Sequence, residues 1–296
     1  MTRVCACSSR RGRMFAIVIS AALFVFVFRL PAQEQKYVEV NFPKKEASKQ
    51  VVMIPDTCHT QGIALDDDFL YLSCVDKKLK KGWLYRVARS EFKNPLRTEP
   101  FSFSKLEITE GEQYHASGID VKGACIWVAL ADYHPAPAKS TIKCIDKQSM
   151  TIKKALNIEV NDHIGTLAAF DDWLLGMNWD AQTFYLVDYS GKILTSGANP
   201  GKGSYQDCKY YYGNRIVCSG LAGQVPVKGY LDMIEIPGTD PSSWQLVRRS
   251  VVTQKSKKLF PLTNEAMAFS GSQVYLVPDD LPNPEMYAFN FEEFFK

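Results

Sequence analysis

Three of the four histidines in this chain occupy equivalent positions in a repeated sequence pattern. His59, His115 and His163 each stand just before a short apolar stretch, and a turn then leads to a second apolar stretch. Imidazole is the commonest metal-binding side chain in proteins, and it also exchanges protons near neutral pH. The three histidines are therefore candidate metal ligands, and without a metal they are candidates for acid–base chemistry.

Amide and carboxylate residues accompany these histidines at a second equivalent position. Two further repeats begin at Tyr205 and Thr263. At the position two residues after its start, each of the five repeats carries one residue of this set: Gln61, Ser117, Gly165, Asp207 and Glu265. Glu265, Asp207 and Gln61 are candidate catalytic residues, because carboxylates transfer protons and an amide can orient a substrate. With zinc on the histidines, metal-bound water would attack an ester, lactone or phosphate.

Two other interpretations of these residues stay open. A histidine where a strand begins can simply hydrogen-bond the backbone of a neighbouring repeat. Calcium would instead prefer the oxygen-rich residues after the second apolar stretches, although such residues also cap turns. These are Asp76, Asp132, Asn178, Asp180 and Asp279. The expected cofactor is thus a divalent metal, either zinc or calcium, or none.

The repeats themselves predict the elements that position these residues. Copies begin at intervals of roughly 40 to 60 residues, which fits about four short strands per repeat and is typical of β-propeller blades. Aromatic and β-branched residues are plentiful, whereas long amphipathic helical patterns are missing. The sequence predicts an all-β fold, a five-bladed β-propeller over residues 59–296. Equivalent positions of different blades should then meet at one mouth of the central channel.

The last repeat contains only three strand-like stretches before the chain ends at Lys296. A strand-like patch at Tyr37–Phe42 lies in the otherwise polar segment 36–58. We expect this patch to supply the missing outer strand, because a borrowed N-terminal strand closes the ring and covers exposed edges. Segment 36–58 is accordingly a linker together with a ring-closing strand.

Residues 1–35 are typical of a signal peptide or a signal anchor. Four arginines precede the apolar run Met14–Phe28, which is somewhat short for a comfortable membrane span. The chain has a net charge of +3, but this segment holds five Arg and one Glu, leaving 30 basic and 31 acidic residues. We therefore expect a secreted, periplasmic or extracellular protein, or one tethered by a single N-terminal anchor, that does not bind nucleic acid.

Six cysteines outside this segment fall in pairs within single blades. We predict the disulfides Cys58–Cys74, Cys125–Cys144 and Cys208–Cys218, since adjacent strands bring such pairs close and an exported protein meets oxidising conditions. Buried free thiols are the alternative, because six cysteines allow 15 pairings.

The stretch Thr60-Gln61-Gly62-Ile63 resembles the beginning of the first blade in plant-type glutaminyl cyclases. The resemblance implies a secreted five-bladed propeller that cyclises N-terminal glutamine, and it carries over Gln61 alone. In the second blade that family has a Glu, where this chain has Ser117. The whole pattern also resembles an uncharacterised group of secreted propellers and the gluconolactonase-type lactonases.

Three functional hypotheses follow from these residues. The first is a small-molecule or peptide-end site at the channel mouth, built from the histidines with Gln61, Asp207 and Glu265, and acting as a metal-assisted hydrolase. The second is a non-enzymatic propeller that binds a protein or a glycan through its loops. The third is a cyclotransferase like the glutaminyl cyclases. Membrane contact is expected only through the N-terminal segment.

Overall fold

The computed structural model describes residues 38–41, 48–51, 58–93, 102–222, 227–256, 258–278 and 285–292. The chain divides into two compact units, Met1–Glu34 and Gln35–Lys296, and every described residue lies in the second. The predicted N-terminal leader and Asp279 therefore lie outside the described residues. No helix of the described part is long and apolar enough to cross a membrane.

Five antiparallel blades make up the second unit, each described here from its innermost to its outermost strand. Blade one contains β3 (Cys58–Leu65), β4 (Phe69–Asp76), β5 (Lys81–Ala88) and β6 (Phe103–Glu107). Blade two contains β7 (Gln113–Lys122), β8 (Cys125–Asp132), β9 (Ser140–Asp146) and β10 (Ile152–Ile158). Blade three contains β11 (Ile164–Ala169), β12 (Trp173–Asn178), β13 (Thr183–Asp188) and β14 (Ile193–Ala198).

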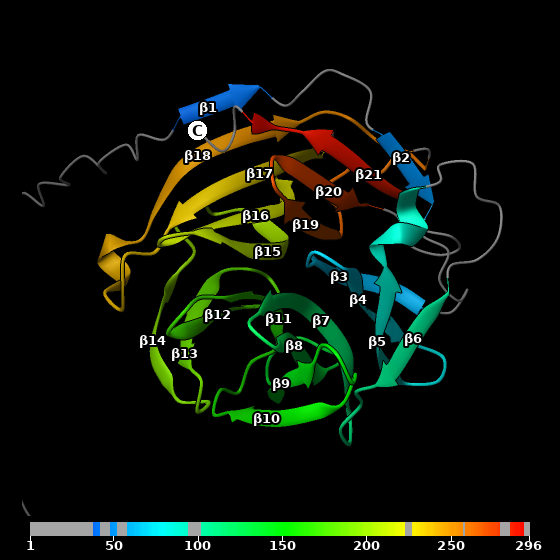
Figure 1. The fold of residues 1–296 in the computed structure, drawn as a ribbon. Coiled ribbons are helices and arrows are strands. Elements are labelled where there is room, and N and C mark those ends of the chain that lie inside the picture. The colour runs from blue at the N-terminus through cyan, green and yellow to red at the C-terminus, as the bar shows by residue number, and fades with distance from the viewer. Residues whose placement is uncertain are drawn as a thin grey trace, which may run out of the picture. The chain divides into compact units, whose positions relative to one another are not determined.

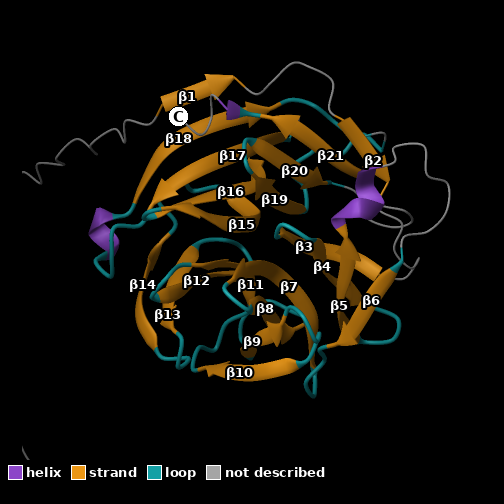
Figure 2. Cartoon of the chain, in the orientation of Figure 1, coloured by secondary structure: helices purple, strands orange, loops and turns teal. Residues whose placement is uncertain are grey.

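Blade four contains β15 (Ser204–Tyr212), β16 (Arg215–Ala222), β17 (Lys228–Glu235) and β18 (Gln245–Val252). Blade five contains β19 (Ala266–Ser270), β20 (Gln273–Val277), β21 (Glu285–Asn290) and β2 (Ser48–Val51). The blades form a ring with β3, β7, β11, β15 and β19 around its centre (Figure 1). Strands dominate the described residues, which also include the short helical segments η1 (Arg89–Lys93) and η2 (Pro241–Ser243) and a helical residue at Glu292 (Figure 2). The predicted five-bladed propeller is confirmed.

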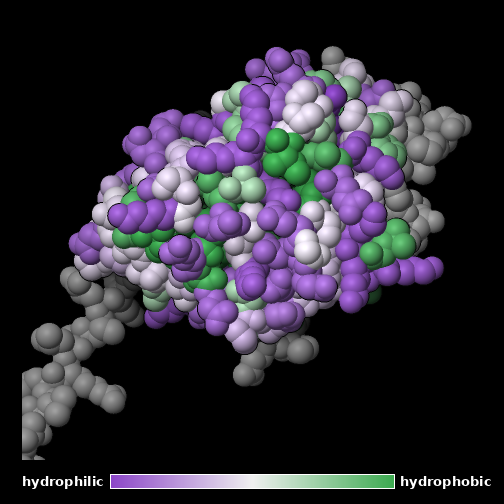
Figure 3. Space-filling model, turned by 90° about the horizontal axis from the view of Figure 1, so that it is seen from below, coloured by the Kyte–Doolittle hydropathy of each residue, from purple (hydrophilic) through white to green (hydrophobic). Residues whose placement is uncertain are grey.

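The burial of each strand explains its position between the inner and the outer edge of its blade. In β4 every residue after Phe69 is buried, because the second strand is covered by the next blade on each face. The outer strand β10 is mostly exposed instead, and the side of the molecule shown in Figure 3 is largely hydrophilic, with separate hydrophobic patches. Among the described residues, a buried apolar cluster lies between each pair of neighbouring blades, so blade-to-blade packing supplies the main hydrophobic stabilisation.

An N-terminal strand closes the ring, but not the one predicted. The outer strand of blade five is β2 (Ser48–Val51), which pairs antiparallel with β21. The patch predicted for this position contains β1 (Val38–Asn41), which pairs parallel with β18 and adds a fifth strand to blade four. The Tyr37–Phe42 assignment was therefore wrong. The apolar patch is compatible with pairing at any sheet edge. The polar sequence of β2 did not identify that segment as a strand.

The three predicted disulfides are confirmed, and each lies within one blade. Cys58–Cys74 joins β3 to β4, Cys125–Cys144 joins β8 to β9, and Cys208–Cys218 joins β15 to β16. Disulfides of this kind are typical of proteins that mature in an oxidising compartment. Every described strand, apolar cluster and disulfide lies in Gln35–Lys296.

Candidate functional site

Four of the five innermost strands carry β-bulges close to where they begin. The pairing register shifts at Gln61 in β3, at Gly165 in β11 and at Gln206 in β15, and in β7 it shifts across Ser117 and Gly118. A bulged residue leaves the regular alternation of the strand and can turn its side chain away from the sheet. Here the bulges lie at one end of the ring, which we call the mouth face.

The bulge register corrects the alignment of blade four. Gln206, and not Asp207, is the residue equivalent to Gln61 and Gly165. A second register shift between Tyr210 and Tyr212 inserts one extra residue before the turn of β15. Because the repeats were aligned on that turn, the extra residue shifted the predicted site residue of blade four by one position, from Gln206 to Asp207.

A pocket of about 150 Å³ opens at the mouth face. It brings together residues that begin the first strands and residues that follow the second strands of several blades. We call it the mouth pocket, and its lining residues are His59, Gln61, His115, Tyr133, His163, Gly165, Asn178, Trp179, Tyr205, Gln206 and Glu265. Five of the six predicted site residues thus meet, and Asp207 is the exception.

His59 links the amide of Gln61 to the carboxylate of Glu265. Nε2 of Gln61 can only donate, so at 2.5 Å the acceptor is Nδ1 of His59. The proton of a neutral His59 is then on Nε2, which lies 3.8 Å from Oε1 of Glu265. Gln61 also donates to the carbonyl of Thr60 at 3.0 Å, which fixes the orientation of its amide. These three side chains form one polar wall of the mouth pocket.

His115 and His163 form a second pair, whose proton positions follow from one backbone carbonyl. Nδ1 of His163 lies 2.9 Å from the carbonyl oxygen of His134, so this nitrogen must donate. Nε2 of a neutral His163 then accepts from Nδ1 of His115, 2.8 Å away. The proton of neutral His115 is therefore on Nδ1, and its Nε2 carries a lone pair. Among the described residues, this Nε2 has no hydrogen-bond partner.

Burial keeps both members of this pair uncharged at neutral pH. Desolvation, followed by the neighbouring His163, holds the pKa of His115 well below its usual 6.5. Desolvation also lowers the pKa of His163 to about 4, although its bond to the His134 carbonyl acts in the opposite direction. His134 itself is exposed, as its Pro-rich loop predicts, and only its backbone serves the pair.

Three aromatic residues of the lining, Tyr133, Trp179 and Tyr205, were not among the predicted site residues, and the first two contact His115. The ring of Trp179 stacks on His115 at 5.1 Å, and Tyr133 meets the edge of His115 at 4.8 Å. Tyr133 follows the last residue of β8, and Trp179 follows the last residue of β12. The signal that could have identified them is this shared position after the second strand, which Lys77 occupies in blade one.

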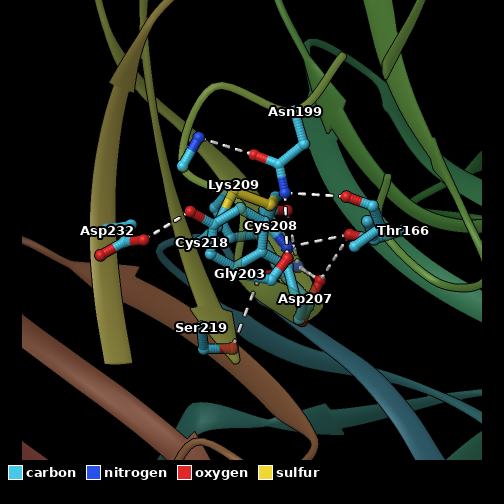
Figure 4. The surroundings of a disulfide bond; sticks show 12 residues. Thr166, Asn199, Gly203, Asp207, Cys208, Lys209, Cys218, Ser219 and Asp232 are labelled. Atoms are coloured by element: carbon cyan, nitrogen blue, oxygen red, sulfur yellow. Dashed lines mark hydrogen bonds and ion pairs between the residues drawn. A yellow bond between two sulfur atoms is a disulfide. The ribbon is translucent and has the colours of Figure 1, made fainter. Parts of the chain in front are cut away.

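Asp207 lies away from the mouth pocket, in the interior of the ring. It is fully buried, forms an ion pair with the buried Lys209, and accepts a hydrogen bond from the Met267 backbone at 3.0 Å. Thr166 also lies beside it, next to the Cys208–Cys218 disulfide (Figure 4). Burial raises the pKa of Asp207 to about 6, against the effect of Lys209. These contacts join blades three, four and five, so the structure gives Asp207 a bridging role.

The three histidines do not present three converging ring nitrogens. Both nitrogens of His163 take part in hydrogen bonds, and Nδ1 of His59 is held by Gln61. In the described ranges, no group of three or more His, Cys, Asp or Glu side chains is arranged to hold a metal ion. A zinc site on His59, His115 and His163 would require these hydrogen bonds to break.

The oxygen-bearing residues proposed for calcium cap turns where they are described. Asp76 accepts from the Leu79 backbone, Asp132 from the Lys139 backbone, and Asn178 from the backbones of Gln182 and Thr183. Their oxygens stabilise the loops that carry Lys77, Tyr133 and Trp179. The calcium hypothesis also included Asp279, which lies outside the described residues.

Comparisons with known proteins agree with this fold. A family model described as a family of unknown function (DUF6454) matches residues 39–290, and no curated protein matches the chain. The structure of glutaminyl cyclase from Myxococcus xanthus is similar over 86% of this chain and 97% of its own, with a TM-score of 0.55 and 11% identity. A protein of unknown function from Bacteroides caccae is similar over 81% and 80%, with a TM-score of 0.48 and 10% identity. At 11% identity the likeness to the Myxococcus xanthus structure concerns the fold alone.

Proposed function

We propose, for a chain that belongs to the DUF6454 family of unknown function, that the mouth pocket binds a small ligand through an amino group. The N-terminus of a peptide carries such a group. One observation carries the proposal: His115, whose Nε2 keeps a lone pair, and Glu265, which carries a carboxylate, both line a single small pocket. Both are hydrogen-bond acceptors, and an ammonium group is a donor that offers three protons.

Charge favours an amine over an anionic ligand. A positive charge about 4 Å from a carboxylate near a protein surface gains roughly 4 kcal/mol, and a carboxylate or phosphate ligand would lose a comparable amount. The neutral His115 offers no positive charge that could compensate for an anion. The ring of Trp179 is a further aromatic group to which cations are attracted, whereas the ring of Tyr133 already has Nζ of Lys77 5.2 Å from its centroid. Together these groups select a small cation with N–H donors.

A second candidate is a cyclotransferase, and the position of Gln61 in the pocket favours it. In such a reaction the free amine of an N-terminal glutamine attacks its own side-chain amide carbon. A C–N bond forms, ammonia leaves, and the proton released by the amine passes to the leaving ammonia through a nearby base. His59 and Glu265 are the groups of this pocket that could transfer that proton. The Myxococcus xanthus enzyme supports the choice of this reaction as the first to assay.

Binding of free and N-acetylated glutaminyl peptides to Gln35–Lys296 tests the amine proposal, with calorimetry as the measurement. We expect the free amine to bind at least tenfold more tightly. Glu265→Gln and His115→Phe should remove that preference. His134→Ala is the matched control, since it keeps the backbone carbonyl that orients His163. Equal affinity for the two peptides would contradict the proposal.

The same samples separate the alternatives. Release of ammonia from the free peptide, lost in Gln61→Ala, would identify a cyclotransferase, whereas binding without turnover would identify a binding protein. Elemental analysis tests the metal-assisted hydrolase. One equivalent of zinc, lost when His59, His115 and His163 are replaced by Ala, would overturn the amine proposal, because the metal would occupy the His115 lone pair.

We further propose that the protein acts outside the cytoplasm, either released or held by its N-terminal segment. The three disulfides support an oxidising compartment, and the basic and apolar pattern of residues 1–35 supports export.

A further inference from the structure

Two loops of the mouth face expose apolar side chains among lysines. The first follows β18 and reads Lys255-Ser256-Lys257-Lys258-Leu259-Phe260. Leu259 is 73% exposed and Phe260 is 44% exposed, and Lys255 and Lys258 are exposed beside them. We call residues 255–260 the basic tip. Isolated exposed leucines are common, but two adjacent apolar side chains at the end of a lysine-rich loop are characteristic of membrane-binding loops.

Two backbone hydrogen bonds within the basic tip hold it in a turn. The Ser256 N–H donates to the Phe260 carbonyl at 2.9 Å, and the Leu259 N–H donates to the Ser256 carbonyl at 3.0 Å. Leu259 adopts φ of 67°, a left-handed conformation that is unfavourable for a non-glycine residue. The loop therefore presents Leu259 to solvent from a defined turn.

A second loop repeats this chemistry in blade one. The turn between β4 and β5 reads Lys77-Lys78-Leu79-Lys80, and all four residues are exposed, Leu79 by 59%. Asp76 fixes the turn by accepting from the Leu79 backbone at 2.9 Å. An apolar side chain is again surrounded by lysines.

Strand directions put both loops at the end of the ring that carries the mouth pocket. Asp76 at the end of β4 pairs with Cys58 at the beginning of β3, next to His59. Val252 at the end of β18 pairs with Gly229 near the beginning of β17, on the same side as the beginning of β15. Trp179, which lines the pocket and is 40% exposed, lies at this end too.

We infer that the mouth face docks on an anionic lipid surface. Lysines of the two loops would contact the headgroups, while Leu259, Phe260 and Leu79 enter the apolar boundary. Charge complementarity selects this occupant, because both exposed apolar groups are flanked by lysines and neither forms the broad flat patch that a protein partner would cover. This contact is separate from the N-terminal segment and brings the mouth pocket to the lipid surface.

Vesicle co-sedimentation of Gln35–Lys296, which lacks the N-terminal apolar run, tests the inference. We expect binding to vesicles of phosphatidylserine and phosphatidylcholine at a 3:7 ratio, and at least tenfold weaker binding to phosphatidylcholine alone. Replacing both apolar residues of the tip (Leu259→Ser with Phe260→Ser) should weaken binding at least tenfold. Lys255→Glu with Lys258→Glu should act similarly, and 0.5 M salt should reduce binding of the unchanged protein.

The matched control removes exposed apolar residues from outer strands, with Phe103→Ser and Ile152→Ser, and should bind like the unchanged protein. Circular dichroism confirms that each variant is folded. Equal binding to the two kinds of vesicle, or full binding by a folded tip variant, would overturn the inference. So would a dimer in sedimentation that the tip variant disperses, since the tip would then bind a second copy of the chain.

Discussion

One residue type at three equivalent positions has three different contacts here. His59 faces the carboxylate of Glu265, His115 keeps a lone pair on Nε2, and His163 is held at both ring nitrogens. The difference arises because the residues around each histidine differ from blade to blade. Neutral His163 fixes the tautomer of its neighbour, since its anchored proton decides which nitrogen of His115 carries the lone pair.

Acid should destabilise the protein through His163. The side chain is fully buried and its pKa is about 4, against an ordinary value of 6.5 in the unfolded chain. Between these values the unfolded chain binds more protons, so the free energy of unfolding is greatest above pH 6.5 and falls as the pH drops towards 4. We expect a loss on the order of 3 kcal/mol from this residue. Urea unfolding at pH 7 and pH 4.5 measures it.

His163→Asn removes this contribution together with the effect of His163 on the pKa of its partner His115, while the remaining titrating groups are shared with the unchanged protein. Asp207 acts in the opposite direction, since its raised pKa favours the protonated folded state between about 4 and 6, but this term cancels in the comparison. The variant should be less stable at pH 7 and should lose less stability on acidification. The same pH dependence in both proteins would show that folding leaves the pKa of His163 near its ordinary value, and would contradict the prediction.

Sequence reasoning located the histidines, Gln61 and Glu265, but it missed other parts of the mouth pocket. The repeat pattern identifies equivalent residues of different blades wherever the strand register is regular. The extra bulge in β15 moved the assignment from Gln206 to Asp207, because a bulge leaves no clear trace in composition. Tyr133 and Trp179 were missed because they come from loops, where aromatic residues read as ordinary surface or core.

At the scale of elements, buried and exposed strands differed in how well they could be predicted. The first three strands of each blade are largely apolar, because neighbouring blades cover them, and their patterns identified them. The outer strands have weaker patterns: β6 and β10 are mostly exposed, and β2 has the polar sequence Ser-Lys-Gln-Val. Its position depends on backbone pairing with β21, which the pattern of one segment cannot reveal.

Two truncations should separate the contributions of β1 and β2. Removal of residues 1–42 deletes β1, a fifth strand on the edge of a blade that already has four, and should change the melting temperature by no more than a few degrees. Removal of residues 1–51 also deletes β2 and exposes the backbone groups of β21. That protein should melt many degrees lower and aggregate more readily, since an open edge pairs with other chains. Scanning calorimetry and light scattering measure both effects, and equal melting of the two truncations would contradict the closure of the ring by β2.

At the scale of the whole molecule, stability is distributed around the ring. Each buried cluster belongs to two adjacent blades, and buried side chains near the centre join blades directly. Asp120, for example, accepts backbone hydrogen bonds from Ala169 in blade three and Tyr210 in blade four. The disulfides act differently, because each links two strands of one blade and none crosses between blades. The disulfides therefore stabilise individual blades, and the packing between blades holds the ring together.

This division predicts how the protein depends on its compartment. Each disulfide closes a loop with a sequence separation of 10, 16 or 19 residues, for which a stabilisation of about 2–4 kcal/mol is typical. Because the disulfides lie in blades one, two and four, their contributions should be nearly additive. Replacing one pair at a time by Ser, and then all three pairs, tests this by urea unfolding of Gln35–Lys296.

Full chain expressed with residues 1–35 should contain three disulfides by mass spectrometry. A cytoplasmic form without that segment should contain free thiols and unfold at a lower urea concentration. If the reduced form were as stable as the oxidised one, the disulfides would give no reason for the protein to fold outside the cytoplasm.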